Sequence, residues 1–404
     1  MSIIEQENQF CAHNYNPIPV VLTRARGIYA WDNSGLRYMD MMSAYSAVSF
    51  GHTHPRLVSA LTTQLTQLTV VSRAFYTDKL APFLEKACEL SGMDKALPMN
   101  TGAEAVETAI KAARKWAYKV KGVAKDKAEI ITCDGNFHGR TVTIVSFSSE
   151  EQYKDGFGPL TPGFQNIPFG NADALEKAIT PNTAAFLVEP IQGENGIIVP
   201  PEGYLKKCEE ICRKNNVLLI CDEIQTGLGR TGKLFAYEYD NIKPDGLILG
   251  KALGGGLLPV SMFLANNEVM DVFTPGDHGS TFGGNPLAAA VGLEALKLTV
   301  EKQMPDHSAT LGEHFKNELL KIDSPMIKEV RGKGLFIGVE IDDKYTSARN
   351  VCEVLMGKGI LSKETHDTVV RFAPPLIITK AEIDKAIEII KSTLSEILKE
   401  YEAA

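Results

Sequence analysis

The sequence has no long apolar run and no excess of positive charge. A helix that spans a membrane needs about 20 mostly apolar residues in a row, and no stretch approaches that length. Lysine and arginine number 42 against 50 aspartates and glutamates, which gives a formal net charge of −8. An acidic chain is a poor partner for nucleic acids or anionic membranes. The N-terminus, MSIIEQENQFCAHNY, also has no basic segment before an apolar one, so we expect no secretory signal.

The cysteines do not follow the spacing of a disulfide framework or of a zinc site. There are seven in 404 residues, and an odd number in a long chain favours free thiols in a reducing compartment, the cytoplasm. Cys208 and Cys212 have helical spacing, but no histidine or second cysteine pair lies nearby to complete tetrahedral zinc. His52 and His54 have no acidic or cysteine cluster beside them in the sequence, and we interpret them as turn histidines. We expect no bound metal.

The middle of the chain alternates strand-like and helical segments. AAFLVEP (184–190) and VLLICDE (217–223) are apolar runs that end in acids, and the charged segment GYLKKCEEICRKNN lies between them. This βαβ pattern is typical of a mostly parallel sheet covered by helices on both faces. The β-rich runs AEIITCDG and TVTIVSFS (141–148) are predicted to add strands.

The pattern changes after about residue 300, where short strands and amphipathic helices predict a smaller α+β domain. GIYAWDNSGLRYMD, near the N-terminus, predicts a hairpin around its Asn-Ser-Gly turn that packs on this C-terminal part. With this length two domains are expected. We predict an N-terminal segment over 1–44, a large domain over 45–295 and a small domain over 296–404.

A glycine-rich stretch, GLGRTGKL (227–234), matches the dinucleotide fingerprint and nearly matches a P-loop. Leu234 stands where a P-loop needs serine or threonine to hold magnesium. Four residues separate the stretch from the preceding strand, and LFAYEYDNIKPD after it does not have a helical pattern. We therefore predict no nucleotide site here, although a nicotinamide dehydrogenase is the alternative that this motif would support.

NTGAEAVE contains a better anion site. Thr101 and Glu104 have the spacing of a capping box, and Gly102 would let the backbone approach a ligand closely. Free N–H groups and the helix dipole favour a phosphate at such a position. An ordinary capped helix would have the same pattern, so this stretch alone does not decide between the two.

A lysine and an acid at the ends of neighbouring strands indicate the chemistry. Asp222 ends VLLICDE, and Lys251 follows the apolar run of DGLILGKALGGG; with Glu189 they stand at carboxyl ends of strands, where parallel sheets bind ligands. A partly desolvated amine forms Schiff bases with carbonyls, and a carboxylate keeps a pyridine nitrogen positively charged. Together with a phosphate cradle, these groups are typical of pyridoxal phosphate chemistry.

Over nearly its full length the chain resembles the class III aminotransferases of the fold-type I pyridoxal-phosphate enzymes, and within them the members that act on ornithine. The resemblance implies an α/β fold in which a large domain, with a mostly parallel central sheet flanked by helices, is joined to a smaller α+β domain. Twelve ordered stretches carry it: AHNYNPIPV, SAYSAV, GHTHP, SRAFY, MNTGAEA, GNFHGR, VEPIQGE, DEIQTGLGRTG, LGKALGGGLLPVS, HGSTFGGNP, VRGKGL and RFAPPL.

The resemblance implies how the ring of pyridoxal 5'-phosphate is held. Lys251 would form the Schiff base and move the proton, and Asp222 would pair with the pyridinium nitrogen. Gln225 would bind the ring hydroxyl, and Phe137 and Ile224 would cover the two ring faces.

The resemblance also implies a phosphate site shared between two subunits. Backbone N–H groups of Gly102 and Ala103 would bind the phosphate from one chain. Ser280 and Thr281 would reach the phosphate of the neighbouring subunit, which makes a homodimer the smallest active unit.

Substrate recognition follows from the same resemblance. Glu194 would mask Arg371 while the terminal amine of L-ornithine reacts and release it for 2-oxoglutarate, whose distal carboxylate Arg140 would bind. Tyr15 would hold the α-amino and carboxylate groups of ornithine, and Tyr45 would line that end of the site. A structural ion pair and a packing aromatic are the alternatives for Glu194–Arg371 and Tyr45.

Two points leave the substrate open. His138 follows Phe137 where ornithine enzymes often have tryptophan, which would change the width or the pH dependence of the channel. N-acetylornithine or 4-aminobutyrate is the alternative substrate within the family, although Tyr15 favours ornithine. A non-catalytic binding protein with the same fold is the alternative from another functional class.

Overall fold

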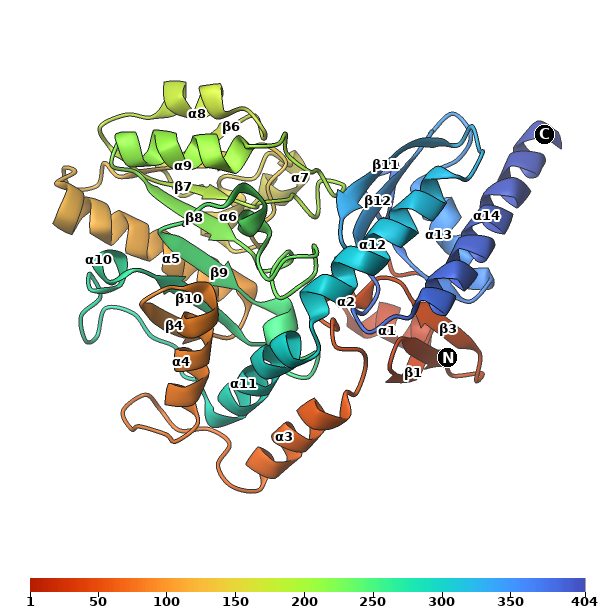
Figure 1. The fold of residues 1–404 in the computed structure, drawn as a ribbon, viewed down its shortest axis with the longest axis horizontal. Helices are drawn as coiled ribbons and strands as arrows, with labels where there is room; N and C mark the ends of the chain where they lie inside the picture. The colour runs from red at the N-terminus through yellow and green to blue at the C-terminus, as the bar shows by residue number, and fades with distance from the viewer. Residues whose placement is uncertain (404) are drawn as a thin grey trace.

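A seven-stranded sheet forms the centre of the larger part of the protein (Figure 1). The computed structural model describes residues 1–403. The strand order is β4-β10-β9-β8-β7-β5-β6, and β10 alone runs against the others in this sheet. The strands are β4 (Lys95–Met99), β10 (Ser261–Ala265), β9 (Gly246–Leu249), β8 (Leu218–Asp222), β7 (Thr183–Val188), β5 (Glu129–Cys133) and β6 (Phe164–Ile167).

The two faces of this sheet contribute to two separate hydrophobic cores. Leu219 and Cys221 of β8 belong to a core that also contains residues of α8 and α9, whereas Leu218 and Ile220 belong to a core formed with α5. Because successive side chains of a strand point to opposite faces, a continuous apolar run supplies both cores. The predicted βαβ unit is confirmed, with β7 and β8 parallel. The helices named are α5 (Gly102–Trp116), α8 (Ala172–Ala178) and α9 (Tyr204–Lys214).

The predicted strand over residues 141–148 is wrong. The segment contains the short helix α6 (Val142–Val145), which Thr141 caps by accepting a hydrogen bond from the Ile144 N–H at 3.3 Å. The β-branched residues favour a strand by propensity, but Ile144 instead packs into the core beside α5. A local cap and tertiary packing therefore outweigh strand propensity here.

The smaller part of the protein contains two four-stranded sheets and both described chain ends (Figure 1). The order β1-β2-β3-β13 joins the predicted N-terminal hairpin to a strand from the C-terminal part, with Ile360 beside Met39 in register. The hairpin and its packing on the C-terminal part are thus confirmed. The second sheet has the order β11-β12-β15-β14. The domain boundaries at residues 44 and 295 stay predictions.

The smaller part is built from the following strands and helices. Its strands are β1 (Leu22–Arg26), β2 (Tyr29–Asp32), β3 (Arg37–Asp40), β11 (Ile327–Lys333), β12 (Phe336–Ile341), β13 (Ile360–Leu361), β14 (Lys363–Thr365) and β15 (Val369–Phe372). Its helices are α1 (Ile3–Phe10), α12 (Met304–Leu320), α13 (Ala348–Gly357) and α14 (Lys380–Ala403).

The remaining helices are α2 (Ser43–Ser46), α3 (Pro55–Leu65), α4 (Leu80–Ser91), α7 (Glu151–Lys154), α10 (Asn267–Met270) and α11 (Pro286–Glu301). None of the helices within residues 1–403 combines the length and apolar content needed to cross a bilayer.

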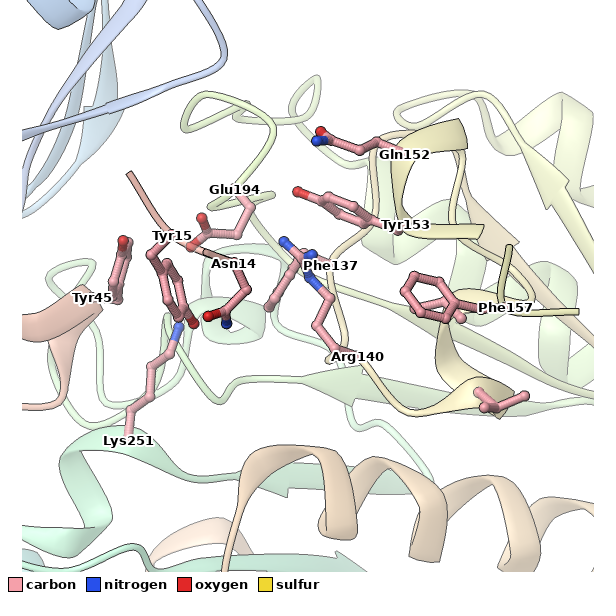
Figure 2. Close-up of a pocket in the computed structure, with 12 residues that line it drawn as sticks. Asn14, Tyr15, Tyr45, Phe137, Arg140, Gln152, Tyr153, Phe157, Glu194 and Lys251 are labelled. Atoms are coloured by element: carbon pink, nitrogen blue, oxygen red, sulfur yellow. The ribbon is translucent and has the colours of Figure 1, made fainter. Parts of the chain in front are cut away.

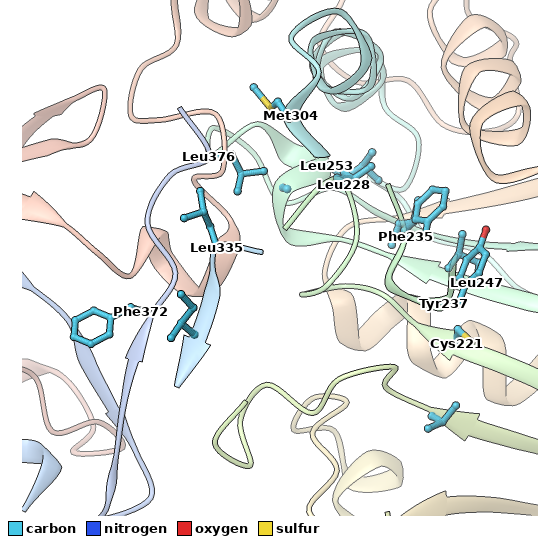
Figure 3. Close-up of a cluster of buried hydrophobic side chains, with 14 of the residues drawn as sticks. Cys221, Leu228, Phe235, Tyr237, Leu247, Leu253, Met304, Leu335, Phe372 and Leu376 are labelled. Atoms are coloured by element: carbon cyan, nitrogen blue, oxygen red, sulfur yellow. The ribbon is translucent and has the colours of Figure 1, made fainter. Parts of the chain in front are cut away.

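One hydrophobic core continues from the large sheet into the smaller part. Figure 3 shows Leu228 and Leu253, from the loops after β8 and β9, close to Met304 at the start of α12. Leu335 and Leu376 from the smaller part complete the contact (Figure 3). Because interiors pack as densely as organic crystals, this shared core fixes the loops after β8 and β9 against the smaller part.

A buried arginine adds a polar contact to this junction. Arg230, in the glycine-rich stretch, is fully buried and donates through Nη1 to the carbonyl oxygens of Leu335 and Pro374 at 3.0 and 2.6 Å. Its Nη2 donates to the hydroxyls of Ser43 and Ser49 at 3.2 and 3.0 Å. Burial lowers the pKa of Arg230 to about 9, which leaves the guanidinium charged at neutral pH. One side chain therefore joins three distant segments of the chain.

Replacing this arginine should destabilise the whole protein. We expect R230A to lower the free energy of unfolding by about 3 kcal/mol, because it leaves four buried acceptors unsatisfied and opens a cavity. Arg213, whose side chain is 62% exposed beside Glu209, provides the control. R213A should change the free energy by less than about 0.5 kcal/mol. Chemical unfolding followed by circular dichroism measures both, and equal small effects would contradict the role assigned to Arg230.

Candidate active site

Two connected cavities open beyond the carboxyl ends of β7, β8 and β9. The outer cavity has a volume of about 520 Å³ and the inner one about 200 Å³. They share Phe137, Glu194 and Lys251. Carboxyl ends of parallel strands are where such sheets bind ligands, so the predicted catalytic lysine stands at the junction of both cavities.

Lys251 begins a short 3₁₀ turn, Lys251–Gly254, directly after β9. Its φ of 44° lies in the left-handed region, which is strained for a residue with a side chain. Burial lowers the pKa of Lys251 to about 8, and the nearby Glu194 opposes this shift. Figure 2 shows the amine pointing toward Tyr15 and Asn14. A substantial fraction of neutral amine is therefore present close to physiological pH.

The glycines that follow Lys251 are explained by close packing. Gly255 has a φ of +63°, and a Cβ there would lie 3.0 Å from Leu57 in α3 and 3.3 Å from Val291 in α11. A side chain would thus be strained by the backbone conformation and crowded by two helices. The glycines let the turn after Lys251 approach the helices that support it.

Asp222 contacts a histidine at the base of the inner cavity. The Asp222 carboxylate accepts from Nδ1 of His138 at 2.6 Å and from the Ile224 N–H at 3.0 Å. Burial would lower the pKa of His138, but the hydrogen bond to Asp222 and its charge raise it. Nε2 of His138 is buried and has no partner among the described residues. His138 therefore holds the carboxylate from the protein side, which sequence reasoning did not predict.

Glu189 is a second buried acid in the inner cavity. Its carboxylate accepts from the N–H groups of Phe137 at 3.0 Å and Gly193 at 3.4 Å. Burial raises the pKa of Glu189 to about 7. The sequence indicated its position at a strand end, but its approach to the Phe137 backbone depends on the fold.

The N-terminus of α5 faces the inner cavity. The Thr101–Glu104 capping box is present, and Gly102 and Ala103 line the cavity. The first N–H groups of a helix have no partner within it. A Cβ on Gly102 would lie 2.9 Å from the Cδ1 atom of Ile224, so a larger residue would displace the Ile224 side chain. The arrangement can bind an anion.

The predicted Glu194–Arg371 pair forms next to both cavities, which Glu194 lines. Nη1 of Arg371 donates to Oε1 of Glu194 at 2.8 Å, and the arginine side chain is 1% exposed. Burial would raise the pKa of Glu194, but Arg371 and then Lys251 lower it to about 2. Nε and Nη2 of Arg371 are buried and have no partner among residues 1–403. Two donors are thus free to bind a carboxylate.

Tyr45 lies on an unusual turn that sequence reasoning did not predict. Residues Ser43–Ser46 have φ values of 44°, 47°, 58° and 77°, although none is glycine. Left-handed conformations cost about 1–2 kcal/mol for each such residue. The Asp40 carboxylate accepts from the Ser43 N–H at 2.8 Å, and the Ser43 hydroxyl donates to the Ala373 carbonyl at 2.6 Å. These contacts hold the Tyr45 ring 4.6 Å from the Arg371 guanidinium.

Arg140 lies at the other end of the outer cavity. None of the salt bridges in the described chain involves it, and its guanidinium carbon stands 3.5 Å from the ring centroid of Tyr153. Tyr153 in turn meets Phe137 edge to face, with ring centroids 6.4 Å apart. Sequence reasoning missed Tyr153, because an isolated tyrosine in a four-residue helix such as α7 has no motif. Stacking orients the guanidinium and leaves its N–H groups available.

Most predicted site residues are brought together, but two are not. Gln225 donates to Glu194 at 3.2 Å, and Tyr15 lines the outer cavity. Ser280 accepts instead from Asn100 at 2.9 Å and, with the exposed Thr281, does not line either cavity of its own chain. Their predicted role toward a neighbouring subunit stays a prediction.

The histidines of GHTHP are not part of a cluster of potential metal ligands among the described residues. His52 contacts the carboxylate of Asp40 at 2.8 Å, an acidic neighbour that the sequence did not indicate. No group of three or more potential metal ligands occurs in the part of the chain that is described. The seven cysteines are all free.

The environment of Lys251 predicts its pH-dependent reactivity. With any carbonyl ligand removed, we expect Lys251 to react with a short pulse of acetic anhydride with a midpoint near pH 8, against about 10.4 for ordinary lysines. E194Q should move the midpoint lower, because the carboxylate favours the charged ammonium. Mass spectrometry of the Lys251 peptide measures the reaction, and exposed lysines provide the internal control. A midpoint above that of the exposed lysines would contradict the assignment.

Comparisons with known proteins identify the family. A family model for class III aminotransferases matches residues 10–394. The chain is 61% identical over 389 residues to ornithine aminotransferase 2 of Staphylococcus aureus (strain N315), covering 96% of this chain and 98% of that protein. The solved ornithine aminotransferase of Toxoplasma gondii, with partial occupancy of PLP at its active site, has a TM-score of 0.97 and 45% identity, covering 99% of this chain and 95% of that one.

A solved acetylornithine aminotransferase, from Elizabethkingia anophelis, has a TM-score of 0.89 and 48% identity, covering 97% and 98% of the two chains. These matches span nearly the whole chain in sequence and in structure. The large α/β part and the separate smaller part have the predicted fold-type I architecture. The chain belongs to the class III aminotransferases.

Proposed function

We propose that this protein transfers the δ-amino group of L-ornithine to 2-oxoglutarate, which yields L-glutamate 5-semialdehyde and L-glutamate. The observation that carries the proposal is the pair between Glu194 and the buried Arg371 beside Lys251. The pair supplies an arginine that can bind a carboxylate. The oxo acid needs this arginine, whereas the terminal amine of ornithine must avoid an unpaired guanidinium. The high identity to ornithine aminotransferases supports the same conclusion.

The inner cavity fits pyridoxal 5'-phosphate as the cofactor. At one end, α5 presents its first N–H groups beside Gly102, where a larger residue would displace the Ile224 side chain. At the other end, the buried Asp222 carboxylate can face a ring nitrogen. Phe137 and Ile224 line the space between, which suits a flat ring. The donor set therefore matches a phosphate, a pyridine and a carbonyl near Lys251.

When bound, pyridoxal phosphate supplies an electron-withdrawing ring that stabilises negative charge on the carbon that loses a proton. Lys251 has a lowered pKa, so its Nζ can accept that proton and return it within the same cavity. Asp222 would keep a proton on the ring nitrogen, and the hydrogen bond from His138 orients its carboxylate. Gln225, which bonds Glu194, would also contact the ring hydroxyl.

The two substrates require opposite states of Arg371. A terminal amine has only methylene groups beside the reacting carbon, and an unpaired guanidinium there would be costly. Glu194 neutralises Arg371 for that substrate. The α-carboxylate of 2-oxoglutarate can bind the free Nε and Nη2 donors and replace Glu194. Arg140, held by Tyr153, would bind the distal carboxylate.

Tyr15 would recognise the α end of ornithine. It lies beside Tyr45 above Lys251 (Figure 2), at a position where a hydroxyl can bond an α-amino or α-carboxylate group. An N-acetylornithine transaminase is the alternative, which the similarity to the Elizabethkingia anophelis enzyme favours.

We propose a homodimer in the cytoplasm as the working form. Phe75, Tyr76 and Phe282 are 70%, 104% and 55% exposed, and the Arg73 side chain lies close to Gly284, so the two exposed segments are neighbours. Such an apolar surface supports contact with a second copy, in which Ser280 and Thr281 would reach the partner's phosphate. The seven free cysteines fit a reducing compartment.

Comparing three amines tests the substrate. We expect kcat/KM for L-ornithine to exceed the values for N-acetylornithine and 4-aminobutyrate by at least about tenfold, the effect of one well-placed polar contact. A coupled assay for glutamate formation measures all three. Preference for N-acetylornithine would support the alternative.

The control variant is K251A. It should lose both transamination and the visible absorption of the lysine-bound cofactor. Retention of both would reject the assigned chemistry and reopen the dehydrogenase and binding-protein alternatives.

A second test separates the two half-reactions. E194Q leaves Arg371 without a charged partner, so kcat/KM for L-ornithine should fall by about tenfold or more. The half-reaction with 2-oxoglutarate should keep its rate or improve, because the arginine is already available. Stopped-flow spectroscopy of each half-reaction makes the comparison. Equal loss in both half-reactions would indicate that Glu194–Arg371 is only a structural ion pair.

A further inference from the structure

Arg349, at the start of α13 in the smaller part, binds the backbone of the N-terminal segment. Its Nη1 donates to the Asn16 carbonyl and its Nη2 to the Pro17 carbonyl, both at 2.9 Å. On the other side, Nε donates to Glu353 at 2.6 Å, and Nη1 lies 3.5 Å from Glu364. The planar guanidinium thus bridges two carbonyls and two acids, a geometry that arginine holds rigidly.

These two bonds are the principal attachment of the first twenty residues. Among residues 1–403, no other hydrogen bond joins residues 1–20 to the rest of the chain. α1 buries none of its residues, and residues 1–17 are all exposed. Ile18 makes a partial contact with the core. A segment with so little burial depends on its few specific contacts for its position.

The attached segment carries two residues of the outer cavity. Asn14 and Tyr15 line it together with Tyr45 and Lys251. Figure 2 shows both side chains directly above the Lys251 amine, and Tyr15 is 79% exposed. Because Asn16 follows Tyr15 directly, fixing its carbonyl restricts where the Tyr15 ring can lie.

We propose that Arg349 is a positioning residue for amino-donor recognition: it fastens residues 16 and 17, so that Tyr15 stands over Lys251 and can bind the α groups of the donor. This proposal rests on the proposed ornithine activity. It assigns to Arg349, which lies outside the cavity, a role in the specificity for the amino donor. The two bonds from Arg349 to residues 16 and 17 concern the donor end. The contacts of 2-oxoglutarate, through Arg371 and Arg140, do not involve the fastened segment.

The test uses the holoenzyme and two amines. L-ornithine carries the α groups, and 1-aminobutane has the same reacting end without them. R349A should lower kcat/KM for L-ornithine by about tenfold, the effect of losing one specific contact. The values for 1-aminobutane and for 2-oxoglutarate should change by less than about twofold. R349K retains the charge but not the planar fork, and should show most of the same loss.

Two further variants provide controls. R56A removes another arginine that binds two acids, Glu294 and Glu301, away from the N-terminal segment, and should leave all three values unchanged. Y15A should lower the ornithine value as R349A does, and the double variant R349A/Y15A should lose no more than Y15A alone.

A second readout does not depend on activity. Cys11 is the exposed cysteine of the N-terminal segment and can carry a nitroxide label in a Cys88→Ser background. The electron paramagnetic resonance spectrum should narrow in R349A, as the segment becomes more mobile, but not in R56A.

Each outcome bears on one hypothesis. An unchanged spectrum in R349A, or an equal loss with both amines, would overturn the positioning role. No ornithine turnover by the unmodified enzyme would reject the proposed function, while the spectrum would still decide whether Arg349 fastens the segment. A mobile segment with loss confined to L-ornithine supports the proposal.

Discussion

The contact between Glu194 and the buried Arg371 determines how the rest of the site can work. Glu194 and Lys251 line the same cavities, and Arg371 and Lys251 are buried, so an unpaired charge there would be unfavourable. The glutamate balances the arginine, and burial lowers the pKa of the lysine enough to provide a neutral amine. Two buried donors of Arg371 nevertheless remain free. The charges in the site are therefore balanced, and Arg371 can still exchange Glu194 for another carboxylate.

This balance depends on groups outside the cavities. Arg371 lies on β15 in the smaller part, whereas Asp222 ends β8 and Lys251 follows β9 in the large sheet. The position of Arg371 relative to Lys251 and Asp222 therefore depends on the junction between the two parts. The shared apolar core and Arg230 hold that junction. Catalytic geometry at the sheet edge is thus maintained by packing and hydrogen bonds made beyond it.

Local sequence patterns predicted the elements that carry the chemistry, because continuous apolar runs, capping boxes and strand ends are local features. Lys251, Asp222 and the α5 N-terminus followed from such patterns. The helix at residues 142–145 did not, since a cap and packing outweighed β-propensity there. The partner of Asp222, the stacking of Tyr153 on Arg140 and the attachment by Arg349 could not be predicted, because each joins residues far apart in the chain. The glycine-rich stretch lacked the sequence context of a nucleotide motif, but the burial of Arg230 became clear only in the fold.

The left-handed turn at residues 43–46 has a consequence for how the protein is made. Its conformation is unfavourable for four successive residues with side chains, and the carbonyl that bonds the Ser43 hydroxyl belongs to Ala373, 330 residues later. During synthesis from the N-terminus, that acceptor is added 330 residues after Ser43. Tyr45 can therefore reach its final place only after the segment around Ala373 has been made. A nascent chain that stops before this segment would contain Lys251 but not the complete pocket around it.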